Sequence, residues 1–378
     1  MKKNIKKFAL AAVFSLIPTL LIWLPFMLRA KTLWTIPLSQ DGLATIVANY
    51  DGPLYIIVAK TLYNTELIKA SFQFPLPVEY YAAHFPLFPL LIKLFGIITN
   101  YPYSMLIITL LSSILAIYFF SKLVSKFVGK KDAVFLTFLF SILPARWLIV
   151  RSVGSADPLF VAGILASVYY FRDKKFWLSG IWGAIATFTK SPGILLFAGY
   201  GIFYIVDSII SKKITLKIKK AYPLLLIPFA LAGVFFFYKF TMGDFWAYFH
   251  SGDNIHLGFP PFQIFNYSSP WVGTFWLEEI LGVYAVGALG IVRLIQKKEL
   301  ELASFAGIFY LMILFVAHRD LLRYFLPVVP FLYIAFSDIL IKKEVKIILA
   351  VLIIPIYLYS LAFISQNVMP ISNWAPFI

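Results

Sequence analysis

The sequence predicts an all-α, polytopic membrane protein with about eleven transmembrane helices. Of its 378 residues, 61% are hydrophobic and only 13% are charged, and the mean hydropathy is +0.87. A soluble domain is about half apolar and about a quarter charged. Apolar runs near the length that a bilayer requires recur along the chain. Most Lys and Arg residues fall in short clusters between alternate runs, which is the sorting that sets membrane topology.

The apolar runs predict the individual helices in order. They cover residues 8–28, 102–121, 133–150, 156–171, 176–190, 192–210, 221–239, 273–293, 302–317, 321–341 and 346–365. The first run lacks a small-residue cleavage site, so we expect an uncleaved helix with a cytoplasmic N-terminus. An odd number of helices then places the C-terminus outside, and we expect the plasma membrane as the location.

Two predicted outer loops are too long to be simple connections, at about 29–101 and 240–272. The first contains apolar stretches at 54–62 and 85–98 that are shorter than a membrane crossing, which predicts helices lying in the interface. We expect the two loops to form the active face of a single domain that covers 1–378.

The net charge of +16 would suggest nucleic-acid binding in a soluble chain. Here the basic clusters flank apolar runs, so we expect contacts with membrane lipids and none with nucleic acid. The absence of cysteine excludes disulfides and thiolate metal sites. There is no Gly-rich nucleotide loop, Walker sequence or nucleophile elbow, which disfavours a nucleotide-sugar donor and an ATP-driven motor.

Asp51 is the first candidate for catalysis. It follows Tyr50 and precedes a Gly-Pro pair in the first outer loop, where a carboxylate could accept the proton of an attacking hydroxyl. The alternative is a structural one, because an Asp-Gly pair before a helix is a common turn or cap.

At three more positions on the predicted outer face, a structural and a functional interpretation are both open. Asp157 could cap a helix that begins at Pro158, or hold an acceptor hydroxyl or a metal. Lys190 could contact a phosphate or sugar, or extend to the membrane interface. Arg319 and Arg323 are four residues apart, so they would share a helix face near a helix N-terminus, which predicts a phosphate site.

No tight ligand spacing predicts a metal centre, and we expect no tightly bound cofactor. A divalent cation stays an open alternative, because acidic and histidine side chains could converge at the outer face. The groups in question are Asp41 with Asp51, and Asp244 with Asp253 and His256. Binding of sugar hydroxyls is the other reading of the same residues.

Several motifs together resemble those of GT-C membrane mannosyltransferases. Residues 50–59 resemble an aromatic-Asp-x-x-x-Tyr-x-x-Ile-Ala signature, and 84–91 resemble a Phe-x-Pro-x-Tyr-Pro element. Residues 155–160 and 187–193 are similar to the Ser-Glu-x-x-Phe and Thr-Arg-x-x-Gly elements of the PIG-V type of GPI mannosyltransferase. Residues 243–248 and 318–330 also align in kind. The sequence departs from the usual pattern at Tyr50, Asp157 and Lys190, where Trp, Glu and Arg are commoner.

The resemblance implies an inverting glycosyltransferase that takes a sugar, often mannose, from a polyprenyl-phosphate donor. It implies Asp51 as general base, with Arg319 and Arg323 holding the donor phosphate and Lys190 assisting them. It implies that Asp157 and Asp244 orient acceptor or sugar. Within the same motifs we expect His318 at the donor phosphate, and His84, Tyr50 and Tyr55 beside the acceptor or sugar.

The acceptor could be a lipid, a glycan or a protein. Two other functions are compatible with parts of this pattern. A transporter or flippase of lipid-linked sugars would place its charges near the bilayer midplane, often on two related halves, and no repeat is visible. An O-antigen ligase or polymerase would also use a polyprenyl-linked sugar, with a different arginine pattern in the long loop.

Overall fold

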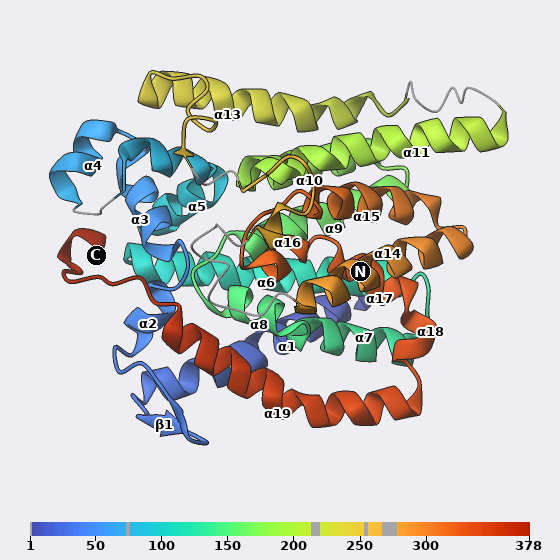
Figure 1. Ribbon diagram of the computed structural model, residues 1–378, viewed down its shortest axis with the longest axis horizontal. Helices are drawn as coiled ribbons and strands as arrows, with labels where there is room; N and C mark the ends of the chain where they lie inside the picture. The colour runs from blue at the N-terminus through green and yellow to red at the C-terminus, as the bar shows by residue number, and fades with distance from the viewer. Residues whose placement is uncertain (1, 73–75, 213–219, 253–255, 267–277) are drawn as a thin grey trace.

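The computed structural model describes residues 2–72, 76–212, 220–252, 256–266 and 278–378. Helices dominate, which confirms the all-α prediction (Figure 1). The longer helices are α1 (Lys2–Met27), α6 (Tyr101–Val124), α7 (Lys130–Ile142), α9 (Asp157–Arg172), α10 (Phe176–Thr189), α11 (Leu195–Ser211), α13 (Leu226–Met242), α14 (Glu278–Gln296), α15 (Leu300–Ile313) and α19 (Lys343–Gln366).

Short elements connect and interrupt these helices. They are β1 (Thr32–Leu33), β2 (Ile36–Pro37), α2 (Leu43–Val47), α3 (Gly52–Thr61), α4 (Thr65–Ser71), η1 (Val78–Ala83), α5 (Leu87–Phe95), α8 (Ala145–Ser152), η2 (Ser191–Ile194), η3 (Tyr222–Leu225), η5 (Gln263–Phe265), α16 (Leu321–Phe325), α17 (Val329–Ala335), α18 (Ser337–Leu340) and η7 (Ala375–Phe377). The strands β1 and β2 form one small antiparallel hairpin.

Five helical stretches in the described residues are long and apolar enough to cross a membrane: Asn4–Met27, Tyr101–Val124, Ser191–Ser211, Tyr222–Met242 and Lys343–Gln366. The pair α7 and α8 makes a sixth if its 68° bend is one broken span. Helices α10 and α15 are apolar but shorter. The chain is therefore an integral membrane protein, and the count of eleven stays a prediction.

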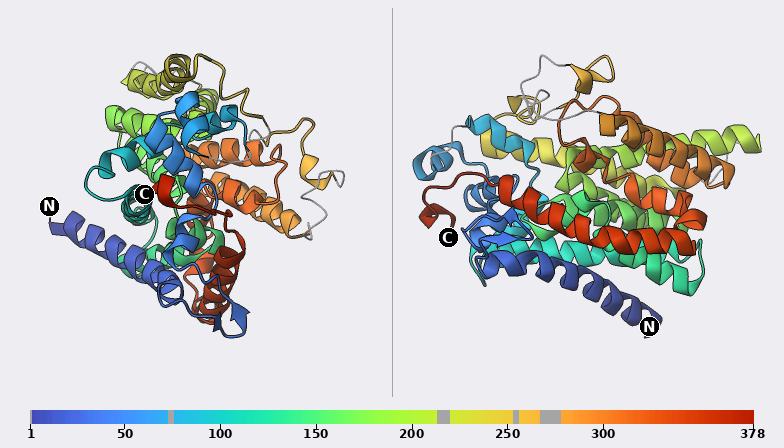
Figure 2. Two further views of the ribbon diagram at one scale, coloured as in Figure 1. Left: turned by 90° about the vertical axis from the view of Figure 1, so that its left-hand side faces the viewer. Right: turned by 60° about the horizontal axis from the view of Figure 1, so that its bottom comes forward.

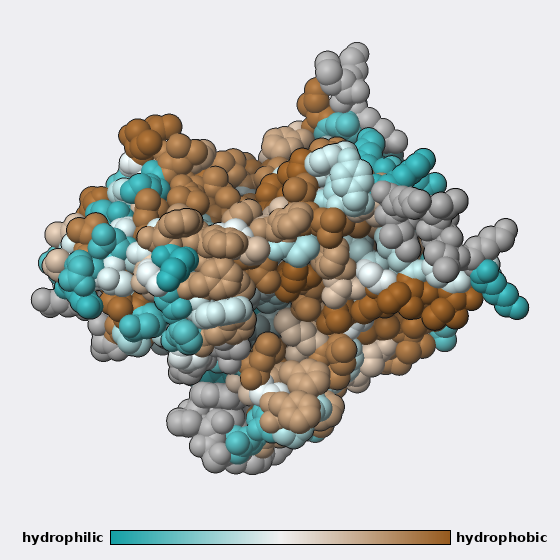
Figure 3. Space-filling view, turned by 90° about the horizontal axis from the view of Figure 1, so that it is seen from above, coloured by the Kyte–Doolittle hydropathy of each residue, from teal (hydrophilic) through white to brown (hydrophobic). Residues whose placement is uncertain are grey.

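The long helices lie roughly along one axis, and α9 packs between α6 and α10. The two termini lie at opposite ends of this bundle (Figure 2). Apolar residues cover most of the face seen in Figure 3, and hydrophilic residues lie mainly toward its margins. Such a surface suits contact with lipid.

Two predicted helices are broken by proline. The expected helix at 133–150 stops before Pro144, and the one at 321–341 divides into α16, α17 and α18, with Pro327 in the gap between α16 and α17. Proline lacks the N–H that an uninterrupted helix requires and disfavours helical geometry in the residue before it. Both breaks lie beside the cavity described below and place Arg146 and Arg323 at short helix ends.

The first outer loop folds into several short helices and the β hairpin. Helix α5 exposes Leu90 and Leu94, as expected of an interfacial helix. Helix α3 differs, since it is buried along nearly its whole length and packs against α5 and α6. Because α3 is held on several sides, Asp51 at its N-terminus has a fixed position.

Candidate active site

A cavity of about 920 Å³ opens where the N-termini of α3 and α9, the C-terminus of α10 and helix α16 meet. This volume lies within the range that small-molecule sites occupy. Among the residues predicted for the site, nine line the cavity: Tyr50, Asp51, Tyr55, His84, Asp157, Lys190, His318, Arg319 and Arg323. Asp244 does not line it. It lies in an exposed loop, where its carboxylate is 2.6 Å from Nδ1 of His250.

The turn that carries Asp51 is tightly constrained. Asn49 is fully buried, and its side-chain amide donates to the carbonyl of Ile364 at 2.7 Å. Tyr50 adopts a left-handed conformation (φ 49°), which is unusual for a bulky residue. A side chain at Gly52 would lie 2.2 Å from the carbonyl oxygen of Val47. The backbone therefore has little freedom on either side of Asp51.

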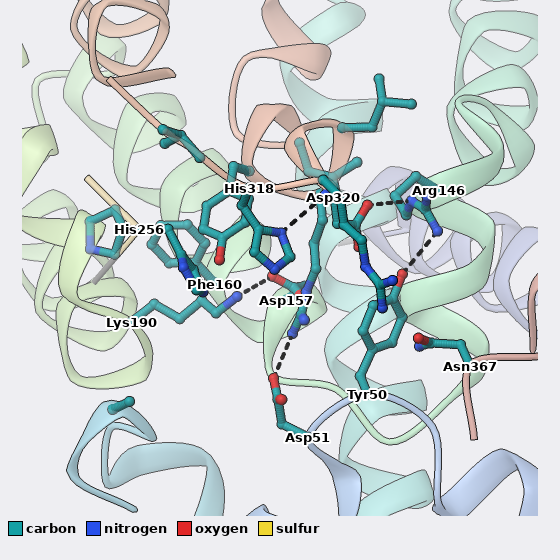
Figure 4. A pocket seen from close by; sticks show the side chains of 18 of the residues that line it. Tyr50, Asp51, Arg146, Asp157, Phe160, Lys190, His256, His318, Asp320 and Asn367 are labelled. Atoms are coloured by element: carbon teal, nitrogen blue, oxygen red, sulfur yellow. Dashed lines mark hydrogen bonds and ion pairs between the residues drawn. The ribbon is translucent and has the colours of Figure 1, made fainter. Parts of the chain in front are cut away.

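The side chain of Asp51 does not act as a helix cap, which was the structural alternative to a catalytic role. Asp51 occupies the N-cap position of α3, but its carboxylate makes no capping hydrogen bond. Its Oδ2 instead accepts from Nη2 of Arg323 at 3.3 Å (Figure 4). Its Oδ1 has no hydrogen bond within the described part of the chain, and about a third of the side chain is exposed. Asp51 thus offers one free carboxylate oxygen to the cavity.

Asp157 is held much more completely than Asp51. Its Oδ1 accepts from Nζ of Lys190 at 2.5 Å, and its Oδ2 accepts from Nε of Arg323 at 2.8 Å and from the hydroxyl of Ser155 at 2.8 Å. The helix begins at Asp157 itself, so this residue does not cap it. Only 4% of the side chain is exposed, and both oxygens are occupied by protein donors.

Lys190 and Arg323 therefore belong to one buried ionic cluster with the two aspartates. The amine of Lys190 turns inward to Asp157 rather than outward to the membrane interface. The guanidinium of Arg323 also lies 4.4 Å from the centre of the Tyr50 ring. The cluster contains two negative and two positive side chains, so its net charge is zero, as buried charges usually require.

These charges set the pKa of Asp51. Burial works to raise it, but the positive charges of Arg323 and Lys190 and the hydrogen bond from Arg323 outweigh burial, and the pKa is lowered from its ordinary value. Asp51 is consequently a carboxylate at neutral pH and can accept a proton.

Arg319 and His318 lie on the neighbouring wall of the cavity. Arg319 precedes α16 instead of sharing a helix face with Arg323, so the expected pairing on one face is wrong. Arg319 is exposed and has no ion pair within the described ranges. Burial, with the charges of His256, Arg323 and Arg319, lowers the pKa of His318 to about 3. His318 is thus neutral, and its Nδ1 accepts the backbone N–H of Asp320 at 3.0 Å.

His84 and Tyr55 form an apolar, aromatic part of the wall below Asp51. Their rings meet edge to face with centroids 5.0 Å apart, and Tyr55 also contacts Phe88. Burial lowers the pKa of His84, whose Nδ1 has no hydrogen-bond partner among the described residues.

Sequence reasoning missed Arg146. It lies inside an apolar run, but the break at Pro144 places it at the start of α8, with only 8% of its surface exposed. Its Nε is 2.8 Å from Oδ1 of Asp320, and it donates to the hydroxyls of Tyr50 (3.1 Å) and Tyr359 (3.3 Å). An arginine two residues after a proline within an apolar segment is the signal that could have revealed it.

Within the described residues, no group of three His, Asp or Glu side chains is arranged to hold a metal ion. The predicted combination that includes Asp253 lies partly outside the described residues. The carboxylates of Asp51 and Asp157 both bind Arg323, and Asp157 also binds Lys190. A divalent cation stays an open alternative.

The fold of this protein is similar to that of solved polytopic membrane enzymes with the GT-C fold. One similar structure is ArnT from Cupriavidus metallidurans bound to undecaprenyl phosphate. It has a TM-score of 0.57 and 11% identity, and the match covers 94% of this chain and 74% of that one.

The oligosaccharyltransferase of Archaeoglobus fulgidus, in complex with Zn and sulfate, is also similar. Its TM-score is 0.55 at 15% identity, with 96% of this chain and 54% of that chain covered. The same organism's AglB in complex with an inhibitory peptide and a dolichol-phosphate gives 0.54 at 14% identity, covering 98% and 57%. The chain thus spans little more than half the length of these oligosaccharyltransferases. No protein-family model and no curated protein sequence matches it.

Proposed function

We propose that this protein is a membrane glycosyltransferase that transfers a sugar from a polyprenyl-phosphate donor to an acceptor hydroxyl, with inversion at the anomeric carbon. The observation that carries the proposal is the contrast between two aspartates on one arginine. Asp157 has both oxygens occupied, whereas Asp51 keeps one oxygen free toward the cavity.

In this mechanism Asp51 accepts the proton of the acceptor hydroxyl as that oxygen attacks the anomeric carbon. The new bond forms between the acceptor oxygen and the anomeric carbon, and the bond to the phosphate oxygen breaks with its electron pair. Polyprenyl phosphate leaves as an anion. A single displacement of this kind inverts the configuration at the anomeric carbon.

The leaving phosphate needs positive charge that the protein does not already neutralise. Arg319 fits this role because it lines the cavity, is exposed and has no ion pair among the described residues. Lys190, whose amine binds Asp157, adds a second positive group to the cavity lining (Figure 4). Arg323 acts mainly through Asp51 and Asp157, since two of its nitrogens are bound to them.

The absence of related halves favours transfer over transport of the lipid-linked sugar. A carrier is often built from two related halves, and no repeat is visible in this sequence. The ionic groups gather around one cavity, on the N-termini of α3 and α9, the C-terminus of α10 and α16. Similar structures bound to undecaprenyl phosphate and to dolichol-phosphate support a polyprenyl-phosphate donor.

The motif resemblance favours mannose and the PIG-V type, and the charge sorting favours a plasma-membrane enzyme with its cavity on the outer side. The test is to incubate the purified protein with polyprenyl-phosphate mannose, glucose and galactose in parallel, and to measure release of polyprenyl phosphate. We expect release from the mannose donor. No release from any of the three, with or without added acceptors, would contradict the proposed function.

A further inference from the structure

The segment that follows α19, residues 367–377, begins beside the turn that leads into α3. The backbone N–H of Met369 donates to the carbonyl of Ala48 at 2.8 Å. Val368 forms an antiparallel β-bridge with Asn49. The segment therefore binds the backbone of the chain two and three positions before the proposed base.

A contact between two side-chain amides reinforces this backbone pairing. The NH2 group of Asn49 donates to the carbonyls of Ile364 at 2.7 Å and Thr45 at 3.3 Å, which uses both of its protons. Its Oδ1 accepts from Nδ2 of Asn367 at 3.2 Å. Asn49 is fully buried, and within the described part of the chain Asn367 is the only donor to this oxygen. Loss of that donor would leave a buried acceptor unsatisfied.

The same segment also reaches the opposite end of α3. Nζ of Lys60, in the last turn of that helix, donates to the carbonyl of Pro376 at 2.7 Å. Phe377 is buried, and its ring centroid lies 5.3 Å from that of Phe72, at the end of α4. Figure 1 shows this end of the chain on the same side of the molecule as α3 and α4. The segment thus holds α3 at both ends.

The first residues of the segment also form part of the cavity wall. Asn367, Val368 and Met369 all line the cavity, and Figure 4 shows Asn367 beside Tyr50. Phe363, near the end of α19, lines it as well, and its ring centroid lies 5.7 Å from that of Tyr50. A shift of this segment would therefore move the turn and the cavity wall together.

The position of Asp51 depends on such backbone support. Its carboxylate makes one 3.3 Å contact with Arg323, which by itself constrains it little. Tyr50, directly before it, has a φ of 49°, and a bulky residue keeps this conformation only where its surroundings hold it. A misplacement of about 1 Å at a reacting group can lower a rate about 10²-fold.

We infer that Asn367 is a positioning residue for the proposed base, and that residues 367–377 hold the Asp51 turn in the geometry that sugar transfer requires. The inference rests on the proposed glycosyltransferase function. Asn367 acts through Asn49 and does not take part in proton transfer itself.

The experiment measures release of polyprenyl phosphate from polyprenyl-phosphate mannose by the full chain, with octyl α-D-mannopyranoside as a soluble acceptor probe. The kcat is referred to the fraction of protein that binds donor, so that loss of folded protein does not count. Asn367→Ala should lower kcat about tenfold or more and change the donor KM less than about twofold, because the donor contacts stay in place. The double variant Asn49→Ala with Asn367→Ala should lower kcat no further than Asn49→Ala alone, since both changes remove one contact.

Asn373→Ala is the matched control, because it removes an exposed amide from the same segment that caps the N–H of Ala375 and does not line the cavity. It should leave kcat unchanged. If Asn367→Ala fails to fold, two variants of Met369 decide. Met369→Pro removes the N–H that donates to Ala48, whereas Met369→Ala keeps it. Met369→Pro should lower kcat about tenfold more than Met369→Ala.

A wild-type kcat in Asn367→Ala, or a donor KM that rises as much as kcat falls, would overturn the inference. Multiplying losses of kcat in Asn49→Ala and Asn367→Ala, or equal kcat values for the two Met369 variants, would overturn it as well. Each of these results leaves the glycosyltransferase proposal standing. A wild type that releases no polyprenyl phosphate, with the sugar passing neither to the glycoside nor to water, would defeat the proposed function and this inference with it. The two failures are thus distinguishable.

Discussion

Asp51 and Asp157 bind different nitrogens of the same guanidinium group, that of Arg323, although they begin two different helices. The contact to Asp157 is short and buried, and the contact to Asp51 is longer and partly open to the cavity. Two residues of the same chemical type thus have different environments. We expect one to maintain the site and the other to react.

The first prediction concerns stability. Asp157→Asn should lower the free energy of unfolding by about 3–5 kcal/mol, because it leaves Lys190 and Arg323 without their main partner in a buried site. Asp51→Asn removes one long, partly exposed contact and should cost about 1 kcal/mol or less. Thermal unfolding in detergent, followed by tryptophan fluorescence, measures both. Equal losses of stability would contradict the assignment of separate roles.

The second prediction separates the two arginines. Arg319→Ala should raise the KM for the donor about tenfold with little change in melting temperature, because Arg319 is exposed and has no ion pair in the described residues. Arg323→Ala should lower the melting temperature as well as activity. The comparison needs donor KM and thermal unfolding for both variants. An Arg319→Ala protein with wild-type donor KM would remove Arg319 from the phosphate site.

The third prediction concerns pH. The pKa of Asp51 is lowered, so the carboxylate stays charged at every pH above its ordinary value near 4, and protonation of Asp51 should not reduce activity there. His318, with its pKa lowered to about 3, stays neutral over the same range. We therefore expect kcat/KM to be flat between pH 5 and 7.5. A loss of activity near pH 6.5 that persists in His256→Gln would contradict this.

The fourth prediction concerns the turn before Asp51. Asn49→Ala removes the hydrogen bonds from the buried amide to the carbonyls of Ile364 and Thr45, which should cost about 1–3 kcal/mol. The displaced turn should also reduce kcat. Asn64→Ala is the control, since it removes the exposed cap of α4 and should cost about 1 kcal/mol without loss of kcat. Equal kcat values for the two variants would show that the turn does not position Asp51.

Much of the fold and part of the cavity could be predicted from the sequence. Hydropathy located the long helices because crossing a bilayer imposes length and composition together. The alternating clusters of Lys and Arg predicted one outer face that carries Asp51, Asp157, Lys190 and Arg323. The structure brings these four side chains into contact. Their roles in catalysis and binding stay predictions.

Other features could not be predicted, because they depend on tertiary geometry. A hydropathy window averages over Pro144 and hides both the break and Arg146. The contact between Arg146 and Asp320, and the C-terminal residues that line the cavity, join segments far apart in sequence. Asp244 is an acidic residue in a predicted outer loop, as Asp51 is, but its loop places it beside His250 and away from the cavity.

The most direct test of the central claim, that Asp51 is the base of an inverting sugar transfer, is a single-turnover measurement. Wild type and Asp51→Asn are mixed with polyprenyl-phosphate mannose and an acceptor glycoside, and the release of polyprenyl phosphate and the anomeric configuration of the product are followed. We predict an inverted product, donor binding within about twofold of wild type, and a release rate lowered about 10³-fold in the variant. Release at a near-wild-type rate by Asp51→Asn, or a product that retains the donor's configuration, would contradict the account.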